Sequence, residues 1–335
     1  MSSMKEVAKL AGVSIATVSR VINNTVPVNE DTLVKVKDAI RALNFKPNLL
    51  AKGLRIKSGR LIGLVVPEIV HHAFVSLINF IHKNAYEHDF DLILGSNLNN
   101  PDVEEYFINN LLRRNVDGII FSRVSDESRV LRLLDKQNIP IVVIDRALED
   151  ERVSSVTVNN STAGRLAADH LAALGHREIA CITGPLNITL CRERLRAFRQ
   201  RLHEAGIALD ERLVCPEDFS FEAGIRAVNG FLSKGIRFTG IWAQNDRMAA
   251  GVLKCLSQHD LKVPDDVSLI GMDDTDMAAL LTPSLTTIKQ PFEEMSRTAV
   301  DIVLRQIQDR AIPRTHIVLE PSLVIRESTA AKGKE

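Results

Sequence analysis

The segment 13-VSIATVSRVIN-23 contains one charged residue, Arg20, among residues suited to packing or to a polar surface. At helical spacing, Val18, Val21 and Ile22 form an apolar stripe. A second face at the same spacing consists of Ala16, Ser19, Arg20 and Asn23. The segment therefore predicts an amphipathic helix with one face for packing and another free to contact a partner.

A second short helix is expected just upstream, in KEVAKLAG. Val7, Leu10 and Ala11 of this segment are expected to pack on the apolar stripe. Gly12 suits a left-handed helix end and Ser14 suits the next N-cap, so the turn between the helices is only a few residues long. Two short helices joined so closely are typical of a helix-turn-helix.

The charge distribution indicates what this helix pair binds, since helix hairpins also occur in many proteins that do not bind DNA. Residues 1–60 contain eleven basic and four acidic side chains, a net charge of +7, whereas the rest of the chain carries −7. Phosphate attracts the first part and repels the second. We therefore expect the second helix to enter a major groove, where Arg20 can donate to O6 and N7 of guanine.

A third helix and a linker complete the N-terminal part. The helix is expected from the N-cap Asn29 to about Leu43, with Val36 and Ile40 facing the first two helices. The next segment is residues 47–59. Its helix-forming middle is shorter than the about 12–15 residues that an isolated helix needs to be stable in water. It is either a flexible tether or a segment that folds when it binds DNA.

Beyond Arg60 the sequence alternates apolar runs with helical stretches. LIGLVVP, FDLILGS, DGIIFSR and IPIVVIDR are almost continuously apolar, as expected of parallel strands buried on both faces. EIACITGP, TGIWAQND and VSLIGMDD repeat this arrangement after residue 160. The pattern predicts an α/β core with two doubly wound parallel sheets.

Ligands of open α/β sheets bind beyond the carboxyl ends of the strands. The polar residues at the expected strand ends are Asp145, Arg146, Asn245, Asp246, Asp273, Asp274 and Gln290. Carboxylates, amides and a guanidinium suit a polyhydroxylated ligand, because each hydroxyl donates and accepts. Phe74 and Phe219 are candidate platforms for its apolar face, whereas Asp246 and Asp274 have the alternative role of capping the next helix.

Several motifs together indicate a family. MKEVAKLAGVSIATVSRVIN and ALNFKPNLLAKGLR, followed by VDGIIF, VVIDR, LGHREIACITGP, NDRMAAGVLK, VPDDVSLIGMDD and LTTIKQP, resemble segments of the lactose repressor and galactose repressor (LacI/GalR) family of bacterial transcription regulators. The resemblance covers nearly the whole chain. It implies a three-helix DNA-binding head, a hinge helix in the minor groove and a two-lobed core like a periplasmic binding protein.

The resemblance also implies a domain organisation. The expected parts are a head at 1–46, a hinge helix or linker at 47–59, an N-terminal lobe at 60–159 with 290–320, a C-terminal lobe at 160–289 with 321–328, and a solvated tail at 329–335. The chain then crosses between the lobes near Asn159, Gln290 and Pro321 and leaves a cleft.

Site residues follow from the same resemblance. DNA contacts are expected at Ile15, Ala16, Thr17, Ser19, Arg20, Asn23, Lys52 and Leu54. Effector contacts are expected at Ala73, Phe74, Asp145, Arg146, Arg194, Phe219, Asn245, Asp273 and Gln290. Leu54 is the expected wedge between base steps. Arg192 cannot share the helix face of Arg194 and is not expected to contact the effector, whereas Trp242 and Phe198 are expected in the core.

Residues 71–74 depart from the family pattern. They read HHAF, whereas many relatives with pentose-like effectors read NPFF or NPFY, which puts a ribose effector in doubt. Adjacent histidines on a loop seldom bind one metal ion together, and no HExxH motif accompanies them, so no metal is expected. Two alternatives remain for His71 and His72: a histidine that donates to a sugar hydroxyl or to an acidic ligand group, and a solvent-exposed pair.

Other classes of protein are disfavoured. No GxGxxG follows a strand, and GxxxxGK[ST] and GxSxG do not occur, so neither an enzyme nor a cofactor is expected. A transport protein would not need the basic head. The N-terminus does not resemble a signal peptide, and no apolar run is long enough to span a bilayer, so we expect a cytoplasmic protein. The four widely spaced cysteines indicate buried, reduced thiols.

Together these features predict a transcriptional regulator, with repression of a carbohydrate-utilisation operon as the expected role. It should bind a near-palindromic double-stranded DNA operator as a homodimer, with no membrane partner, and respond to a sugar or sugar derivative held between its lobes. The tail has no leucine heptads, so a coiled-coil tetramer is not expected. The alternatives are a purine or other non-sugar effector in the same fold and, more distantly, a nucleotide-dependent α/β enzyme.

Overall fold

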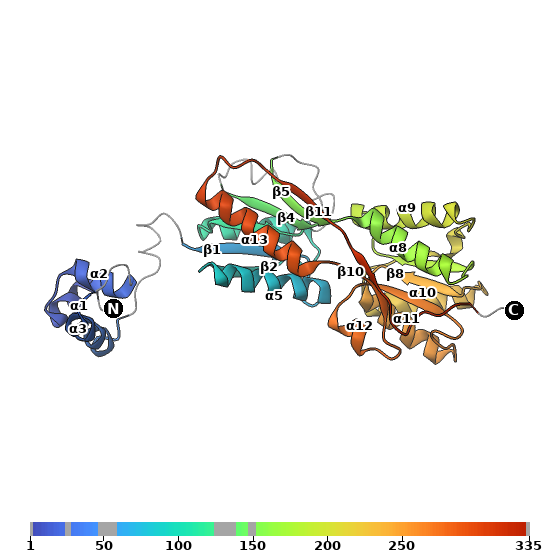
Figure 1. Cartoon of the computed structure of the whole chain (residues 1–335), viewed down its shortest axis with the longest axis horizontal. Coiled ribbons are helices and arrows are strands. Elements are labelled where there is room, and N and C mark those ends of the chain that lie inside the picture. The colour runs from blue at the N-terminus through green and yellow to red at the C-terminus, as the bar shows by residue number, and fades with distance from the viewer. Residues whose placement is uncertain (1–2, 24–27, 46–58, 124–138, 147–151, 333–335) are drawn as a thin grey trace. The chain divides into compact units, whose positions relative to one another are not determined.

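The computed structural model describes residues 3–23, 28–45, 59–123, 139–146 and 152–332. The chain divides into two compact units, residues 1–59 and residues 60–335, which we call the head and the core. Figure 1 shows the helices and strands of each unit.

The described residues of the head form three helices, α1 (Met4–Ala11), α2 (Ile15–Asn23) and α3 (Glu30–Ala42). The sequence prediction of a helix-turn-helix is confirmed in detail at the turn. Gly12 has φ = 67° and ends α1 in the left-handed conformation, and the hydroxyl of Ser14 accepts from the backbone N–H of Thr17 at 3.1 Å. Asn29 caps α3 by accepting from the N–H of Asp31. These caps satisfy backbone groups that would otherwise be left without partners at the helix ends.

The small core of the head is formed by Val7, Ala8, Ala11, Val18, Val36, Ala39 and Phe45. The expectation that Leu10 packs on α2 is wrong, because its side chain is 56% exposed. Helix α1 buries the stripe of Val7, Ala8 and Ala11, and Leu10 lies roughly 100° around the helix from the centre of that stripe. A three-helix core of this size has room for only one stripe from α1.

The described residues of the core form two six-stranded sheets. The first has the order β11 (His316–Leu319), β5 (Ser154–Val158), β4 (Ile141–Asp145), β3 (Gly118–Phe121), β1 (Leu61–Val66) and β2 (Asp91–Ser96). The second has the order β12 (Ser322–Val324), β10 (Thr286–Lys289), β9 (Ser268–Asp273), β8 (Gly240–Ala243), β6 (Ile179–Thr183) and β7 (Val214–Pro216). All neighbouring strands are parallel except β12, which is antiparallel to β10.

The two doubly wound, predominantly parallel sheets confirm the fold that the sequence predicted, and the antiparallel orientation of β12 has a simple cause. Only two residues separate β11 from β12. The chain therefore leaves the first sheet at the carboxyl ends of its strands and enters the second sheet at the carboxyl ends of that sheet's strands. A strand that starts there must run against its neighbour.

Helices cover both faces of each sheet. The first sheet with α5 (His72–Glu87), α6 (Pro101–Arg113) and α13 (Phe292–Gln308) forms what we call the first lobe. The second sheet with α8 (Asn160–Ala173), α9 (Thr189–Glu204), α10 (Phe221–Ser233), α11 (Asp246–Gln258), α12 (Asp276–Leu280) and the 3-10 helix η1 (Glu211–Leu213) forms the second lobe. The chain passes between the lobes after β5, after β10 and after β11 (Figure 1).

Helices α8 and α9 touch through their backbones at Gly164. A Cβ atom at this position would lie 2.9 Å from the backbone nitrogen of Phe198 and 3.1 Å from the Cβ of Ala197, and still closer to the carbonyl oxygen of Arg194. The glycine therefore sets the distance between the two helices. Trp242 on β8 and Phe198 on α9 are fully buried, as the sequence predicted, and their ring centroids lie 4.8 Å apart.

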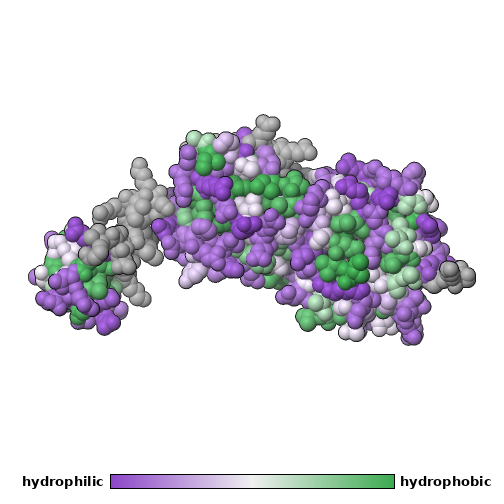
Figure 2. All heavy atoms as spheres, viewed as in Figure 1, coloured by the Kyte–Doolittle hydropathy of each residue, from purple (hydrophilic) through white to green (hydrophobic). Residues whose placement is uncertain are grey.

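The surface of the core is mainly hydrophilic on the face that Figure 2 shows, with apolar side chains gathered in separate areas. Tyr86, Leu98 and Leu280 are each at least 70% exposed. Among the described helices, none combines the length and apolar character needed to cross a membrane.

Candidate functional site

Helix α2 presents the face proposed to read DNA. Ile15, Ala16 and Arg20 are exposed, whereas Thr17 and Ser19 are half-buried. Val18, on the opposite side of the helix, is fully buried and holds α2 against the head core. Among the other residues expected to contact DNA, Lys52 and Leu54 lie outside the described residues, as does the side chain of Asn23.

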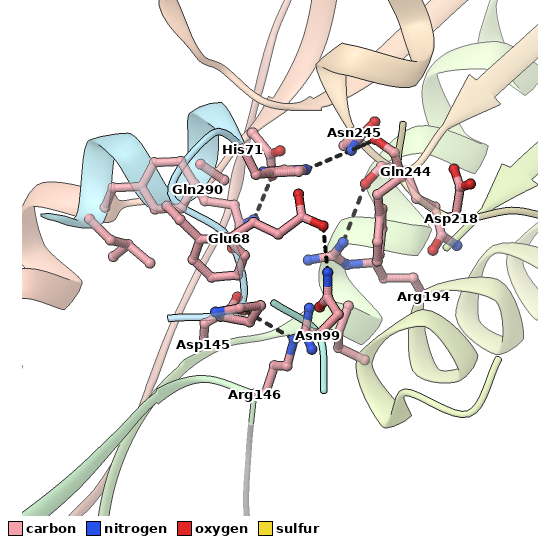
Figure 3. A pocket seen from close by; sticks show the side chains of 18 residues that line it. Glu68, His71, Asn99, Asp145, Arg146, Arg194, Asp218, Gln244, Asn245 and Gln290 are labelled. Atoms are coloured by element: carbon pink, nitrogen blue, oxygen red, sulfur yellow. Dashed lines mark hydrogen bonds and ion pairs between the residues drawn. The ribbon is translucent and has the colours of Figure 1, made fainter. Parts of the chain in front are cut away.

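A cavity lies between the two lobes of the core, at the carboxyl ends of the strands (Figure 3). All nine residues that the resemblance places at effector positions line it: Ala73, Phe74, Asp145, Arg146, Arg194, Phe219, Asn245, Asp273 and Gln290. The volume of the cavity is about 50 Å³. The fold thus brings together side chains that are up to 217 positions apart in the chain, from Ala73 to Gln290.

The cavity has further lining residues that the sequence did not single out. They are Pro67, Glu68, Leu77, Asn99, Leu190, Asp218, Gln244 and Phe292. Gln244 directly precedes Asn245 at the end of β8. Its place beyond the carboxyl end of a strand could therefore have identified it from the sequence. Glu68 and Asn99 belong to loops of the first lobe and are hydrogen-bonded to each other. Their place at the cavity depends on loop conformation, for which the sequence has no periodic signal.

Asp145 and Arg146 end β4 and form a buried charged corner. The Arg146 Nε atom lies 3.9 Å from Asp145 Oδ2, and the guanidinium also donates to the carbonyl of Arg123 at 3.0 Å. The carbon at the centre of the guanidinium lies 5.9 Å from the ring centroid of Phe74. Burial raises the pKa of Asp145, and the neighbouring positive charge of Arg146 partly offsets this rise.

Arg194 approaches the cavity from α9. Its Nε donates to Asn160 Oδ1 at 2.8 Å, and its Nη1 donates to the carbonyl of Gln244 at 3.4 Å. Arg192 instead donates to the carbonyl of Leu186 and does not line the cavity. The structure thus separates the two arginines as their helical spacing predicted.

Asp273 and Gln290 form a second polar corner. The Gln290 amide donates to Asp273 Oδ1 at 2.7 Å. Burial raises the pKa of Asp273 well above its ordinary value, and the nearby carboxyl of Asp246 raises it further. Four residues at the cavity have a left-handed backbone, with φ of 55° at Asn99, 69° at Asp145, 67° at Phe219 and 115° at Asp273. Such strain is commonly retained where it directs side chains into a site.

The other two strand-end carboxylates have structural partners, and neither caps the following helix. Asp246 accepts from the N–H and hydroxyl of Thr275 and from the hydroxyl of Thr287. Asp274 pairs with Arg326 at 2.6 Å. The N-cap of α11 is Asn245 and that of α12 is Thr275, so the capping role expected as the alternative for these carboxylates is wrong.

His71 and Asn245 meet across the two lobes. Asn245 Nδ2 lies 2.8 Å from His71 Nε2, and the histidine ring lies near Phe74 and Phe219, with centroids 5.6 Å and 6.1 Å away. Burial lowers the pKa of His71 to about 3, so the ring is neutral. His72 is exposed. The two histidines are therefore not a solvent-exposed pair.

The histidines, cysteines and carboxylates of the core could in principle serve metal or thiol chemistry. Within the described ranges, no cluster of three or more His, Cys, Asp or Glu side chains has the arrangement of a metal site. The cysteines are free thiols; Cys181, Cys191 and Cys255 are buried, and Cys215 is half-buried. Burial raises the pKa of Cys191 to about 11, so it is protonated at neutral pH.

The cavity thus combines apolar rings with paired donors and acceptors. Phe74, Phe219 and Phe292 supply apolar surface, while carboxylates, amides and guanidinium groups supply hydrogen bonds. The charges of Asp145 and Arg146 oppose each other in the same corner. Such a lining suits an uncharged ligand with many hydroxyl groups, because no unpaired charge of one sign dominates it.

Residues 3–48 match the bacterial regulatory proteins of the lacI family, and residues 168–329 match the periplasmic binding protein-like domain. The HTH-type transcriptional repressor PurR of Photobacterium profundum is 33% identical over 98% of this chain and 98% of its own length. The ribose operon repressor of Escherichia coli (strain K12) is 32% identical over 98% of this chain and 100% of its own length.

Solved structures share the same architecture. The lac repressor dimer bound to operator and the anti-inducer ONPF superimposes with a TM-score of 0.88 and 30% identity, over 98% of this chain and 99% of that one. The likeness spans both the head and the core of the chain.

Proposed function

The chain belongs to the lacI family of bacterial regulatory proteins, and from this premise we propose that it represses transcription under the control of a neutral, monosaccharide-sized sugar. It is a ligand-controlled DNA-binding regulator and not an enzyme. The observation that carries the choice of effector is the lining of the interlobe cavity, where two corners of paired polar groups face apolar rings.

The size of the cavity supports a single sugar ring. Its volume of about 50 Å³ leaves room for roughly three to five water molecules at about 10–15 Å³ each. One ring displaces a comparable number of waters, whereas a disaccharide requires a wider separation of the lobes. The effector contacts are assigned to the nine residues named for this cavity, among which the guanidinium groups of Arg146 and Arg194 supply the strongest hydrogen-bond donors.

We assign DNA reading to α2 and to the linker at residues 47–59, the last part of the head. Ile15, Ala16 and Arg20 are accessible on α2, and the resemblance adds Thr17, Ser19, Asn23, Lys52 and Leu54. A homodimer places two heads on a near-palindromic operator. The likeness to the lac repressor, which is a dimer in its structure with operator, supports self-association.

We propose the domain limits that the resemblance implies: a DNA-binding domain at 1–46, a hinge helix or linker at 47–59, and two lobes between which the chain crosses near Asn159, Gln290 and Pro321. The sheet membership of β5, β10, β11 and β12 supports these limits. Relatives of the chain are bacterial transcriptional repressors, and we infer that this protein likewise acts on DNA in the bacterial cytoplasm.

A non-sugar effector such as a purine is the competing proposal within the same fold. A flat, fused ring would be expected to lie between parallel aromatic faces. In this cavity the His71 ring is tilted by 58° to Phe74 and by 83° to Phe219. This arrangement favours a puckered ring with hydroxyl groups over a flat one.

A thermal-shift screen of neutral monosaccharides, sugar acids and purines on the full-length protein tests the effector class. A neutral monosaccharide present at 100 times its Kd should stabilise the protein by about 2.7 kcal/mol. The same sugar should change the affinity of the protein for a DNA fragment selected from a random pool, because effector and operator binding are coupled reciprocally.

Two arginine variants provide a matched comparison. Arg194→Ala should lose the response to the sugar, whereas Arg192→Ala, two positions away on α9 and outside the cavity, should keep it. Stabilisation by a purine alone, or equal sugar responses in the two variants, would contradict the proposed effector site.

A further inference from the structure

The hydrogen bonds of Asn245 identify the tautomer of the neutral His71 ring, which carries its proton on Nδ1. The N–H of Met248 donates to Asn245 Oδ1 at 2.7 Å as the helix cap of α11, which identifies that atom as the oxygen. Asn245 Nδ2 is therefore the donor, and it donates to the carbonyl of Phe219 at 3.0 Å and to His71 Nε2 at 2.8 Å. Since Nε2 accepts, the neutral imidazole must be protonated at Nδ1.

The Nδ1–H group has no acceptor among the residues that the structure describes, although the atom is buried. His71 occupies the N-cap position of α5 but makes no side-chain cap, so the ring does not serve the helix. It lines the cavity and points toward Asn245 on the opposite wall (Figure 3). A buried donor without an acceptor costs free energy, which an incoming oxygen atom can recover.

Another orphaned group lies along the same cavity. Oε1 of Gln290 is buried and has no partner within the described part of the chain, whereas the buried Gln244 amide interacts with the thiol of Cys181. The cavity therefore offers one fixed donor at His71 and one acceptor at Gln290. This set matches a ligand in which oxygen atoms carry both lone pairs and hydrogens.

We propose that His71 determines effector specificity by donating from Nδ1–H to an oxygen atom of a neutral sugar, so that analogues lacking this oxygen are rejected. This inference rests on the proposed sugar effector. It concerns a residue outside the nine assigned effector positions, for which the sequence had left a hydrogen bond to a ligand as one of two alternatives. Asn245 is the positioning residue, since it holds the ring through Nε2 and thereby fixes which nitrogen faces the ligand.

Two substitutions separate the roles of the two ring nitrogens. In His71→Gln the longer side chain reaches the place of Nε2, so its oxygen can still accept from Asn245, but the Nδ1 donor is lost. In His71→Asn the shorter amide occupies the place of Nδ1 and can still donate. His72→Gln is the matched control, because His72 is adjacent, exposed and outside the cavity.

The first measurement needs no sugar. Long-range ¹⁵N–¹H correlation spectra of the full-length protein, assigned with His71→Gln, report the ring tautomer directly. Protonation at Nδ1 with a bare Nε2 is the expected result. Protonation at Nε2 would overturn the proposal, because the ring would then have no donor on the side away from Asn245.

The second measurement is calorimetric titration with a panel of pentoses and hexoses and their monodeoxy analogues. His71→Gln should bind the best sugar about tenfold more weakly than wild type, while His71→Asn and His72→Gln should remain within about threefold of wild type. One deoxy analogue should bind wild type about tenfold more weakly and His71→Gln no more weakly than the parent sugar does.

The outcomes distinguish this inference from the proposed function. If sugars bind wild type but His71→Gln binds as well as wild type, or His71→Asn loses as much as His71→Gln, the role of His71 is refuted and the effector class stands. If no sugar on the panel binds, the effector class is refuted and the sugar-reading role of His71 falls with it. The tautomer remains a separate test of the donor.

Discussion

The backbone contact between α8 and α9 yields a quantitative prediction for Gly164→Ala. An ordinary Cβ contact is 3.4 Å or longer, and the added atom would meet the nitrogen of Phe198 at 2.9 Å and lie even closer to the carbonyl oxygen of Arg194. The helices must therefore separate by at least about 0.5 Å. Neither of these obstructing atoms can move aside by a side-chain rotation, because both belong to the backbone of α9.

Overpacking of this kind costs up to about 3 kcal/mol, while replacing glycine by alanine inside a helix returns about 1 kcal/mol. The expected net loss is about 2 kcal/mol, which lowers Tm by roughly 4–8 °C in a core of this size. The sugar affinity should fall as well, because the hydrogen bond from Arg194 to Asn160 spans the same helix pair and lengthens when the helices separate.

Gly230→Ala is the matched control. Gly230 lies in α10, and a Cβ atom there would have no neighbour within 4 Å. The gain in helix propensity should raise Tm by roughly 2–4 °C, for about 1 kcal/mol. Differential scanning calorimetry of the three proteins measures both shifts, and circular dichroism checks that each variant is folded. If Gly164→Ala melted at or above the temperature of wild type, the contact between the helices would not be as tight as we describe.

Further predictions concern the head, the linker and the neutral histidine. Arg20→Ala should weaken operator binding by about 1–3 kcal/mol and relax the preference at one base position. Selection from a random DNA pool measures this preference, and an unchanged preference would disprove the role of Arg20. Leu54→Ala should reduce operator bending in a gel assay with permuted sites, and equal bending would argue against a wedge. Removal of residues 1–59 should abolish operator retention, since the basic charge lies there, while the separate core still binds sugar. Burial lowers the pKa of His71 to about 3, whereas the pKa of a histidine in the unfolded chain is about 6.5. As the pH decreases, the unfolded chain therefore binds the proton first. The free energy of unfolding falls between pH 6.5 and pH 3. Between pH 7 and pH 5 wild type should lose up to about 2 kcal/mol more than His71→Asn, measured by urea unfolding, and parallel pH profiles would contradict the neutral buried ring.

The sequence predicts those parts of the fold that have a strong periodic or apolar signal. The seven apolar runs quoted from the core all form strands, and the three helices of the head begin and end within two residues of the expected positions. Strands such as β5, with SSVTV, and β10, with TTIK, did not stand out because hydroxyl side chains interrupt their apolar character. Strand β12 has only three residues, too few for any period to be recognised.

The candidate site was predictable where it follows from topology. Carboxyl ends of parallel strands converge, so Asp145, Asn245 and Asp273 could be expected at one cavity. The state of His71 was not predictable, because it depends on an amide 174 positions away along the chain. The roles of Asp246 and Asp274 also depended on distant partners, since hydroxyl groups and an arginine from other strands and from the C-terminal segment satisfy them.

The pairing of β5 with β11 has a consequence for synthesis of the protein on the ribosome. Ser155 is aligned with His316, so the edge of the first sheet stays open until some 160 further residues have emerged. The apolar cluster of the head, in contrast, is formed by residues between Val7 and Phe45 and can form early. A nascent chain should therefore expose an unpaired β5 edge during about half of its elongation, and chaperones that recognise extended segments would bind there.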